Sequence, residues 1–186
     1  MRRSPISLDR AALSVFFLIL VRPIPAVGFQ SAPPLVKNAP SFEAFPVPRS
    51  EVFKGTPASP RFKTPGQRNY RTMIRLTAEK GPNFAGHFAV GEWGCGTACV
   101  QMAIVDVRSG DVYEGPFGPL PFGGHIYLGT GSEEDHVGVF YRQNSNLFIA
   151  AGCPKYRNCG TYFYEWNGSQ FKLLRRVPVK PLFGGE

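Results

Sequence analysis

The chain of 186 residues is long enough for one domain whose hydrophobic core needs no bound metal for support. Its formal net charge is +8, but the charged residues of positions 1–28 contribute a net +3, which leaves +5 for the rest. Because that excess is spread along the chain, it suits weak attraction to acidic glycans or to an anionic membrane surface. It argues against a nucleic-acid binder, and we expect no nucleic-acid partner.

Positions 1–28 have the pattern of a secretory signal peptide. An arginine-rich start precedes an apolar run at 11–21, which Arg22 ends abruptly. This run is too short to span a bilayer as a mature helix, and the small residues at 26–28 offer a cleavage site before Phe29. We therefore expect a periplasmic or secreted protein without a stable transmembrane segment after processing. An uncleaved anchor and a misassigned start codon are the alternatives.

Residues 29–66 are rich in proline. The prolines of this segment are Pro33, Pro34, Pro40, Pro46, Pro48, Pro57, Pro60 and Pro65. Proline removes a backbone donor and restricts φ, so the segment cannot maintain a strand ladder or a long helix. We predict either an extended linker or an arm laid over the domain. A single disulfide-bonded β domain is expected to occupy residues 67–182.

One short helix is predicted at the start of this domain, within residues 69–80. Four side chains recur there at helical spacing: Tyr70, Met73, Ile74 and Thr77. Gly81 and Pro82 then supply the usual signals for a helix end. The same residues also alternate tolerably as a strand, so both interpretations are open.

From Phe84 onward the hydrophobic pattern has period two, which is typical of β-strands. Two faces are predicted, with Phe84, Phe88 and Val90 on one, and with Ala85, His87, Ala89 and Trp93 on the other. Residues 99–107 are apolar on both faces, which indicates a central strand, and a turn at 108–111 leads into Val112.

Five more strands are predicted after the loop at 115–124. Their ranges are 125–129, 137–142, 146–151, 160–166 and 170–177. Asn167 and Gly168 join the last two as a hairpin. Short strands with turn residues between them predict a mainly β fold, an antiparallel meander of sandwich-like or propeller-blade-like hairpins.

The cysteines Cys95, Cys99, Cys153 and Cys159 indicate an oxidising compartment. Three pairings are possible, and the sequence alone does not choose among them. The first two and the last two cysteines each flank a short loop that contains Gly or Pro, which favours two local bridges worth ~2–3 kcal/mol each. Four free thiols and a four-thiolate zinc site are the alternatives. Structural zinc sites usually have tighter pairs, so no metal or other cofactor is expected.

Residues 81–113, with the motifs GPNFAGH, WGCGxxC and AIVD, resemble an uncharacterised family of exported bacterial proteins. The segment CGTYFYEW at 159–166 also fits, and the resemblance covers roughly residues 67–177. It implies export and a β fold, but it implies no activity. The VDVRSGDVY hairpin is similar to the outer hairpins of propeller blades, although the chain has too few such units to close a propeller.

His87 and Glu92 are the first residues to consider for acid–base chemistry. They are five positions apart, an odd offset, so on a continuous strand they point to opposite faces. This argues against a catalytic dyad. For His87 we expect either a hydrogen-bonded structural role or a place in a shared binding pocket. No catalytic residue is assigned.

Two further clusters have ordinary structural explanations. The carboxylates at 133–135, followed by His136, lack the alternating ligands of a calcium loop, so a solvated turn is expected. Tyr162, Tyr164 and Trp166 share one face of a predicted strand. They are expected to pack in the core, with stacking on sugar rings as the alternative.

The loop between Cys153 and Cys159 is the most suggestive exposed element. If these cysteines are bridged, a small rigid loop presents Lys155, Tyr156 and Arg157. Tyr and Arg are common at binding hot spots, and a fixed loop loses little entropy on binding. Such a cationic loop resembles, in its loop chemistry alone, the loop with which some lysozyme inhibitors of the bacterial envelope enter a carboxylate-lined cleft.

The favoured function is therefore a non-enzymatic envelope or secreted module that binds an envelope protein or an acidic glycan through the 153–159 loop. The first alternative is a hydrolase of envelope polymers that uses His87 or His125 with a carboxylate. The second alternative is a purely structural domain. A chain without a convergent catalytic set favours the binding module.

Overall fold

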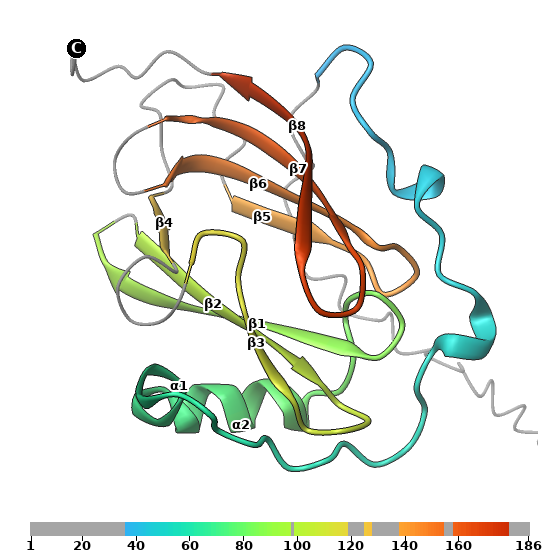
Figure 1. Ribbon diagram of the computed structural model, residues 1–186, viewed down its shortest axis with the longest axis vertical. Coiled ribbons are helices and arrows are strands. Elements are labelled where there is room, and N and C mark those ends of the chain that lie inside the picture. The colour runs from blue at the N-terminus through green and yellow to red at the C-terminus, as the bar shows by residue number, and fades with distance from the viewer. Residues whose placement is uncertain (1–35, 98, 119–124, 128–137, 155–157, 179–186) are drawn as a thin grey trace, which may run out of the picture.

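The alternation of apolar residues produces two antiparallel sheets that pack face to face (Figure 1). The computed structural model describes residues 36–97, 99–118, 125–127, 138–154 and 158–178, and the predicted signal peptide lies outside these ranges. The first sheet contains β1 (Phe88–Gly96), β2 (Cys99–Asp106) and β3 (Val112–Glu114), and the second contains β5 (Gly138–Tyr141), β6 (Leu147–Pro154), β7 (Gly160–Trp166) and β8 (Phe171–Pro178). The short strand β4 (His125–Tyr127) pairs with both β2 and β6 and thereby joins the sheets. The mainly β, antiparallel fold is confirmed.

The strand β2 is central in the first sheet, as its apolar character on both faces predicts. β1 pairs along one edge of β2, and β3 and β4 pair along the other. The turn at 108–111 leads into β3 as expected. The predicted hairpin between β7 and β8 is also present, with a loop at 167–170 in which the Asn167 carboxamide accepts hydrogen bonds from the N–H groups of Ser169 and Gln170.

Two helices precede the first sheet. Thr64 caps α1 (Pro65–Asn69) with a capping box, because its hydroxyl accepts from the Gln67 N–H at 3.1 Å and its own N–H donates to Gln67 Oε1 at 3.3 Å. Of the two interpretations of residues 69–80, the helical one holds, with α2 at Arg71–Glu79.

The helix α2 covers the outer face of the first sheet. Ile74 and Ala78 pack against Ala89 and Trp93 of β1 and against the apolar residues of β2 and β3. Gly91 makes the close approach possible, because a Cβ at this position would lie 1.9 Å from the Thr77 hydroxyl. The absence of a side chain at Gly91 therefore lets α2 pack closely on β1 at Thr77.

The space between the sheets holds the largest apolar cluster. Its buried members include many aromatic residues: Phe84, Phe88, Tyr141, Phe148, Tyr162, Tyr164 and Trp166. The predicted common face of Phe84, Phe88 and Val90 is confirmed, and Ala89 and Trp93 lie on the opposite face as expected. The prediction for Ala85 is wrong, since it also packs between the sheets. The reason is local: Ala85 and Gly86 have φ of 42° and 80°, and this turn interrupts the alternation before β1 begins.

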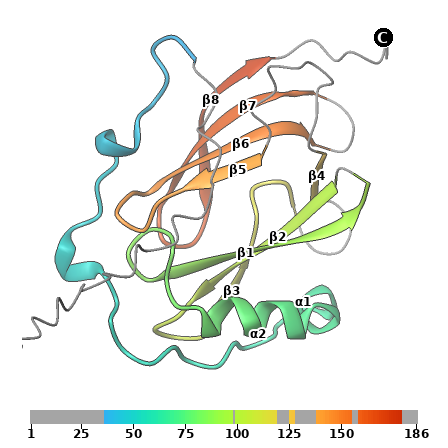
Figure 2. The ribbon, with the colours of Figure 1, turned by 180° about the vertical axis from the view of Figure 1, so that it is seen from behind.

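The proline-rich segment, described from residue 36 onward, runs along one side of the molecule from the β8 end of the second sheet to α1 (Figures 1 and 2). It contains two single-turn 3₁₀ helices, η1 (Phe42–Ala44) and η2 (Arg49–Glu51). Phe42 is buried on the outer face of the second sheet, and Val47 is buried in the inter-sheet cluster. Phe53 and Phe62 pack against the cluster beneath α2. The segment is therefore laid over the domain, and its hydrophobic residues contribute to all three apolar clusters.

Within the described residues, no helix has both the length and the apolar character that a membrane span requires.

Candidate functional site

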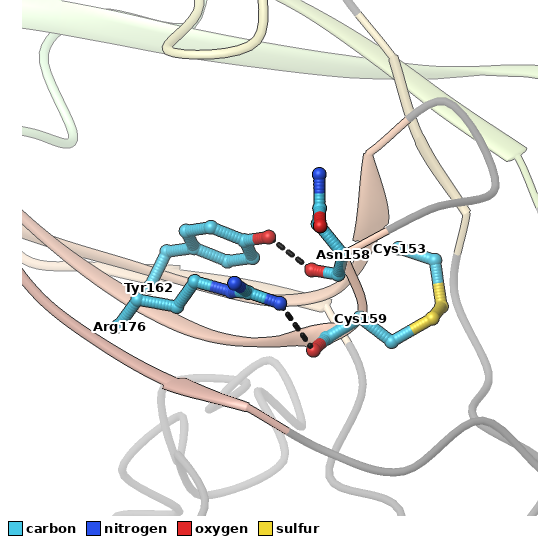
Figure 3. Close-up of a disulfide and its surroundings, with 5 residues drawn as sticks. All are labelled: Cys153, Asn158, Cys159, Tyr162 and Arg176. Carbon is cyan, nitrogen blue, oxygen red and sulfur yellow. Dashed lines mark hydrogen bonds between the residues drawn. A yellow bond between two sulfur atoms is a disulfide. The ribbon is translucent and has the colours of Figure 1, made fainter. Parts of the chain in front are cut away.

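The Cys153–Cys159 bridge closes the turn between β6 and β7 (Figure 3). The antiparallel register sets Gly152 opposite Gly160, so the two strands bring the cysteines together, with their Cα atoms 3.9 Å apart. The predicted residues Lys155, Tyr156 and Arg157 lie outside the described residues. The structure therefore defines the base of this turn and the strands that carry it.

Side chains from β7 and β8 hold the base of the turn. Asn158 has φ of 52°, a left-handed conformation that asparagine tolerates, and its carbonyl accepts a hydrogen bond from the Tyr162 hydroxyl. The Arg176 guanidinium donates to the Cys159 carbonyl at 3.4 Å and lies 5.6 Å from the centre of the Tyr162 ring (Figure 3). Burial raises the pKa of Tyr162, which keeps its hydroxyl protonated and able to donate.

Three exposed cations lie on β8, the edge strand that ends beside this turn: Lys172, Arg175 and Arg176. Arg175 donates to the carbonyls of Lys37 and Asn38, which attaches this part of the proline-rich segment to β8. Among the residues that are described, none of the three cations forms an ion pair with a carboxylate. Arg175 and Arg176 therefore place uncompensated positive charge at this end of the second sheet, whereas Lys172 lies at the other end of β8, opposite Glu165.

The second bridge, Cys95–Cys99, closes the turn between β1 and β2, with the Cα atoms 5.1 Å apart. Both predicted local pairings are thus confirmed, and all four cysteines of the chain are in disulfides. No sulfur atom is therefore available as a thiolate ligand or nucleophile. Two bridges indicate that the protein matures in an oxidising compartment.

His87 is partly buried at the entry to β1. Its Nε2 lies 3.9 Å from Asp106 Oδ1, and its ring centre is 4.2 Å from that of Phe88. Its Nδ1 is buried and has no hydrogen-bond partner in the described part of the chain. Burial lowers the pKa of His87, and the nearby Asp106 carboxylate opposes this effect. The other histidine proposed for a hydrolase, His125, lies in β4 opposite Gln101.

Glu92 is not brought to His87. It lies on the inter-sheet side of β1, and its carboxylate accepts a hydrogen bond of 2.9 Å from the Tyr141 hydroxyl of β5. Solvent reaches the Glu92 side chain, yet burial among the surrounding residues raises the pKa of its carboxyl, and the bond from Tyr141 opposes that rise. Sequence reasoning missed Tyr141, because 49 positions separate the two residues and no local pattern links them.

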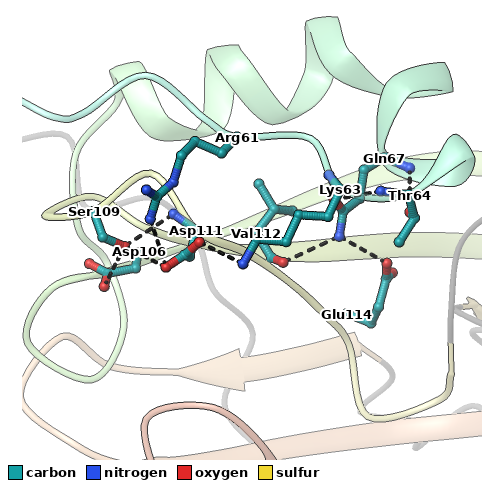
Figure 4. A network of polar contacts seen from close by, with 9 residues as sticks. All are labelled: Arg61, Lys63, Thr64, Gln67, Asp106, Ser109, Asp111, Val112 and Glu114. Atoms are coloured by element: carbon teal, nitrogen blue, oxygen red, sulfur yellow. Dashed lines mark hydrogen bonds and ion pairs between the residues drawn. The ribbon is translucent and has the colours of Figure 1, made fainter.

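A third polar cluster lies at the turn between β2 and β3 (Figure 4). The Asp111 carboxylate forms ion pairs with Arg61 at 2.9 Å and with Lys63 at 2.8 Å. The hydrogen bond from Lys63 is the largest cause that lowers the pKa of Asp111, and Ser109 adds a second bond. Because both cations belong to the proline-rich segment, the cluster holds that segment on the first sheet.

Gln67 extends the same cluster from α1. Its side-chain amide donates to the Val112 carbonyl at 3.2 Å and to the Glu114 carboxylate at 3.3 Å (Figure 4). Gln67 is 3% exposed, so these bonds satisfy a polar group that would otherwise be buried without partners. These contacts attach α1 to β3 and assign the cluster a structural role.

The remaining sequence candidates divide into two groups. The stripe of Tyr162, Tyr164 and Trp166 is buried between the sheets, so the core interpretation is confirmed. The acidic turn at 133–136 lies outside the described residues. Arg176 was not singled out from sequence, although the Arg175–Arg176 pair at the end of a predicted strand was a signal that could have found it.

Fold and bridges together define a class, a mainly β, disulfide-bonded domain formed under oxidising conditions. No protein-family model, curated protein or solved structure matches the chain.

Proposed function

We propose that this protein is a periplasmic or secreted binding module that contacts an acidic partner through the turn at 153–159 and the adjacent end of β8. The proposal rests on the fixed orientation and the uncompensated charge of Arg176. Its exposed guanidinium is oriented by the Cys159 carbonyl and the Tyr162 ring, and no carboxylate in the described ranges neutralises it.

Preorganisation supports a binding role for this surface. A disulfide and two side-chain hydrogen bonds already restrain the base of the turn, so a partner would not have to order it. Tyr and Arg side chains dominate many binding hot spots, and the sequence places Tyr156 and Arg157 within the same loop. The partner class with matching charge is an envelope protein with a carboxylate-lined cleft or an acidic glycan.

The partner is sought by pull-down from an envelope extract with the mature chain. Replacing Lys155, Tyr156 and Arg157 together by alanine should abolish capture, and Arg176→Gln should weaken it by about tenfold or more, the range of hot-spot residues. Arg71→Gln, at an exposed cation on α2, is the matched control and should leave capture unchanged. If the triple alanine variant and Arg176→Gln both capture the partner normally and keep their melting temperatures, the proposed contact surface is refuted.

Export is proposed on the leader pattern and the two bridges. Intact-mass measurement on the protein from its native cell should show a chain that begins near Phe29 and has no thiol that alkylates. An uncleaved leader together with four alkylatable thiols would contradict this location.

A hydrolase is the second candidate, and one observation favours it. Among the described residues, His87 Nδ1 has no hydrogen-bond partner, and the ring lies beside Asp106, with Glu51 and Glu165 lining the same cavity. Turnover of a panel of envelope glycans and peptides, lost in His87→Gln, would establish this function in place of the binding role. Absence of turnover with intact partner capture supports the binding module.

A further inference from the structure

A cavity of about 290 Å³ opens where the β7–β8 turn meets the segment that leads into β1. It is lined by Glu51, Ala85, His87, Phe88, Asn146, Glu165, Trp166, Asn167 and Gly168. Ligand pockets start at roughly 300 Å³, so the cavity suits a molecule of about one small ring. Its walls come from η2, the entry to β1, the start of β6 and the end of β7, four segments that only the fold brings together.

The charged groups of the cavity wall are carboxylates. Glu51 and Glu165 line it, no Lys or Arg does, and neither carboxylate forms an ion pair with any described residue. The nearby Arg108 donates to the backbone carbonyl of Glu51 and leaves that carboxylate unoccupied. Burial lowers the pKa of His87, so its imidazole adds no positive charge at neutral pH. The cavity therefore favours a cation.

Polar groups of the same wall lack protein partners. Trp166 is 2% exposed, and its indole Nε1 has no hydrogen-bond partner among the residues described. His87 Nδ1 is in the same state. A buried polar atom without a partner costs stability, and each such atom in a native protein calls for an explanation. Both residues line the cavity, so a bound molecule would lie next to them.

From this combination we infer that the cavity binds a small hydroxylated ammonium compound of the size of a single amino sugar. The ammonium group pairs with the carboxylates of Glu51 and Glu165, hydroxyl groups meet the amides of Asn146 and Asn167, and Phe88 and Trp166 form the apolar wall. This site is separate from the proposed partner surface. It lies at the opposite end of the β6–β7 hairpin from the Cys153–Cys159 bridge, roughly 20 Å away along the eight residues of β6.

Glucosamine is the probe, and the two tryptophans of the chain provide the readout. In proton–nitrogen correlation spectra of the whole mature protein, glucosamine should shift the Trp166 indole signal saturably. The Trp93 indole lies on the helix side of the first sheet and donates to Gln101, so its signal should stay unchanged. Glucose and N-acetylglucosamine, which have the ring without the charge, should bind at least fivefold more weakly.

Glu165→Gln and Glu51→Gln should each weaken glucosamine binding about three- to fivefold, as expected for a partly exposed ion pair. The control Glu79→Gln, at an exposed carboxylate on α2, should have no effect. Any of three results would overturn the inference. They are no shift of the Trp166 signal at millimolar glucosamine, equal binding of glucose and glucosamine, or unchanged glucosamine affinity in both cavity variants. Arg176→Gln should bind glucosamine normally. The partner surface at the 153–159 turn and the glucosamine cavity can therefore fail independently of each other.

Discussion

The Tyr141 hydroxyl donates to the Glu92 carboxylate at 2.9 Å and thereby links the two sheets beside their shared core. Tyr141 belongs to β5 and Glu92 to β1, strands that share no backbone pairing. Burial is the largest cause that raises the pKa of both groups, and the Glu92 carboxylate raises that of Tyr141 further. The phenol therefore stays protonated and serves as a permanent donor to the carboxyl.

This relationship predicts a pH-dependent effect of Glu92→Gln. A raised pKa in the folded state means that the folded protein favours the protonated carboxyl. The stabilising contribution is complete below the unfolded-state pKa, near the ordinary value of 4.5, and is lost as pH rises through the folded value. At neutral pH, Glu92→Gln should therefore raise the melting temperature. The gain in the free energy of unfolding should be less than ~1 kcal/mol, because solvent screens the group.

The check is a series of thermal unfolding curves from acidic to neutral pH. The advantage of Glu92→Gln should disappear as the pH approaches the ordinary glutamate value. Tyr141→Phe removes the donor and should act in the opposite direction at neutral pH. A variant Glu92→Gln that is less stable than the parent at neutral pH would show that the carboxylate is favourably held.

Gly91→Ala should destabilise the protein by about 1–3 kcal/mol, the usual cost of overpacking a tight contact. The added Cβ would lie 1.9 Å from the Thr77 hydroxyl and would push α2 away from β1. Gly94→Ala, on the same strand, is the matched control, because a Cβ there has nothing within 4 Å. Denaturant unfolding gives both values. Equal stability of the two variants would mean that α2 adjusts without cost.

Asp111→Asn should release the proline-rich segment from the first sheet while leaving the two sheets intact. The variant loses both ion pairs, to Arg61 and Lys63, so the backbone bond from Arg61 N–H to the Gly110 carbonyl should open more often. Hydrogen exchange at residues 58–63 should accelerate several-fold at neutral pH.

The pH dependence gives this prediction a second test. Because the pKa of Asp111 is lowered, its contribution is present above the unfolded-state value and is lost as pH falls through the folded one. The parent should therefore approach the variant in acid. Glu43→Gln, which breaks the exposed pair with Arg142 elsewhere in the segment, should leave exchange at residues 58–63 unchanged.

Removing either disulfide should cost about 2–3 kcal/mol, since both close short loops. Paired serine substitutions of Cys153 with Cys159, and of Cys95 with Cys99, should lower the free energy of unfolding by similar amounts. Only the first pair should also weaken partner capture, because only that bridge carries the proposed contact surface. If capture falls equally in both variants, the loss reflects stability and the proposed surface loses its support.

The elements that could be predicted from sequence depend on local patterns. The central strand β2 was recognisable because a strand buried on both faces must be apolar throughout. The two bridges were favoured among three possible pairings because short loops separate the cysteines, and antiparallel strands do hold them close together. Ala85 was placed on the wrong face because its positive φ breaks the alternation, and alternation alone contains no dihedral information.

The candidate sites were largely beyond prediction. Asp111 meets Arg61 and Lys63 only after the proline-rich segment has folded back over the sheet. Arg176 reaches Cys159 because β8 pairs with β7 beside the closed turn. The cavity combines residues from four segments whose positions depend on sheet packing.

By itself, the sequence predicted the β class and the order of the strands along the chain, and it favoured the local disulfides, whereas it left residues 69–80 open between a helix and a strand. Each of these depends on neighbours within a few positions, through side-chain period, turn residues and loop length. The tertiary structure alone decided which charges meet, since a carboxylate such as Glu92 is paired by whichever strand packs across from it. That partner is selected by the packing of whole sheets, and no pattern near Glu92 in the chain contains it.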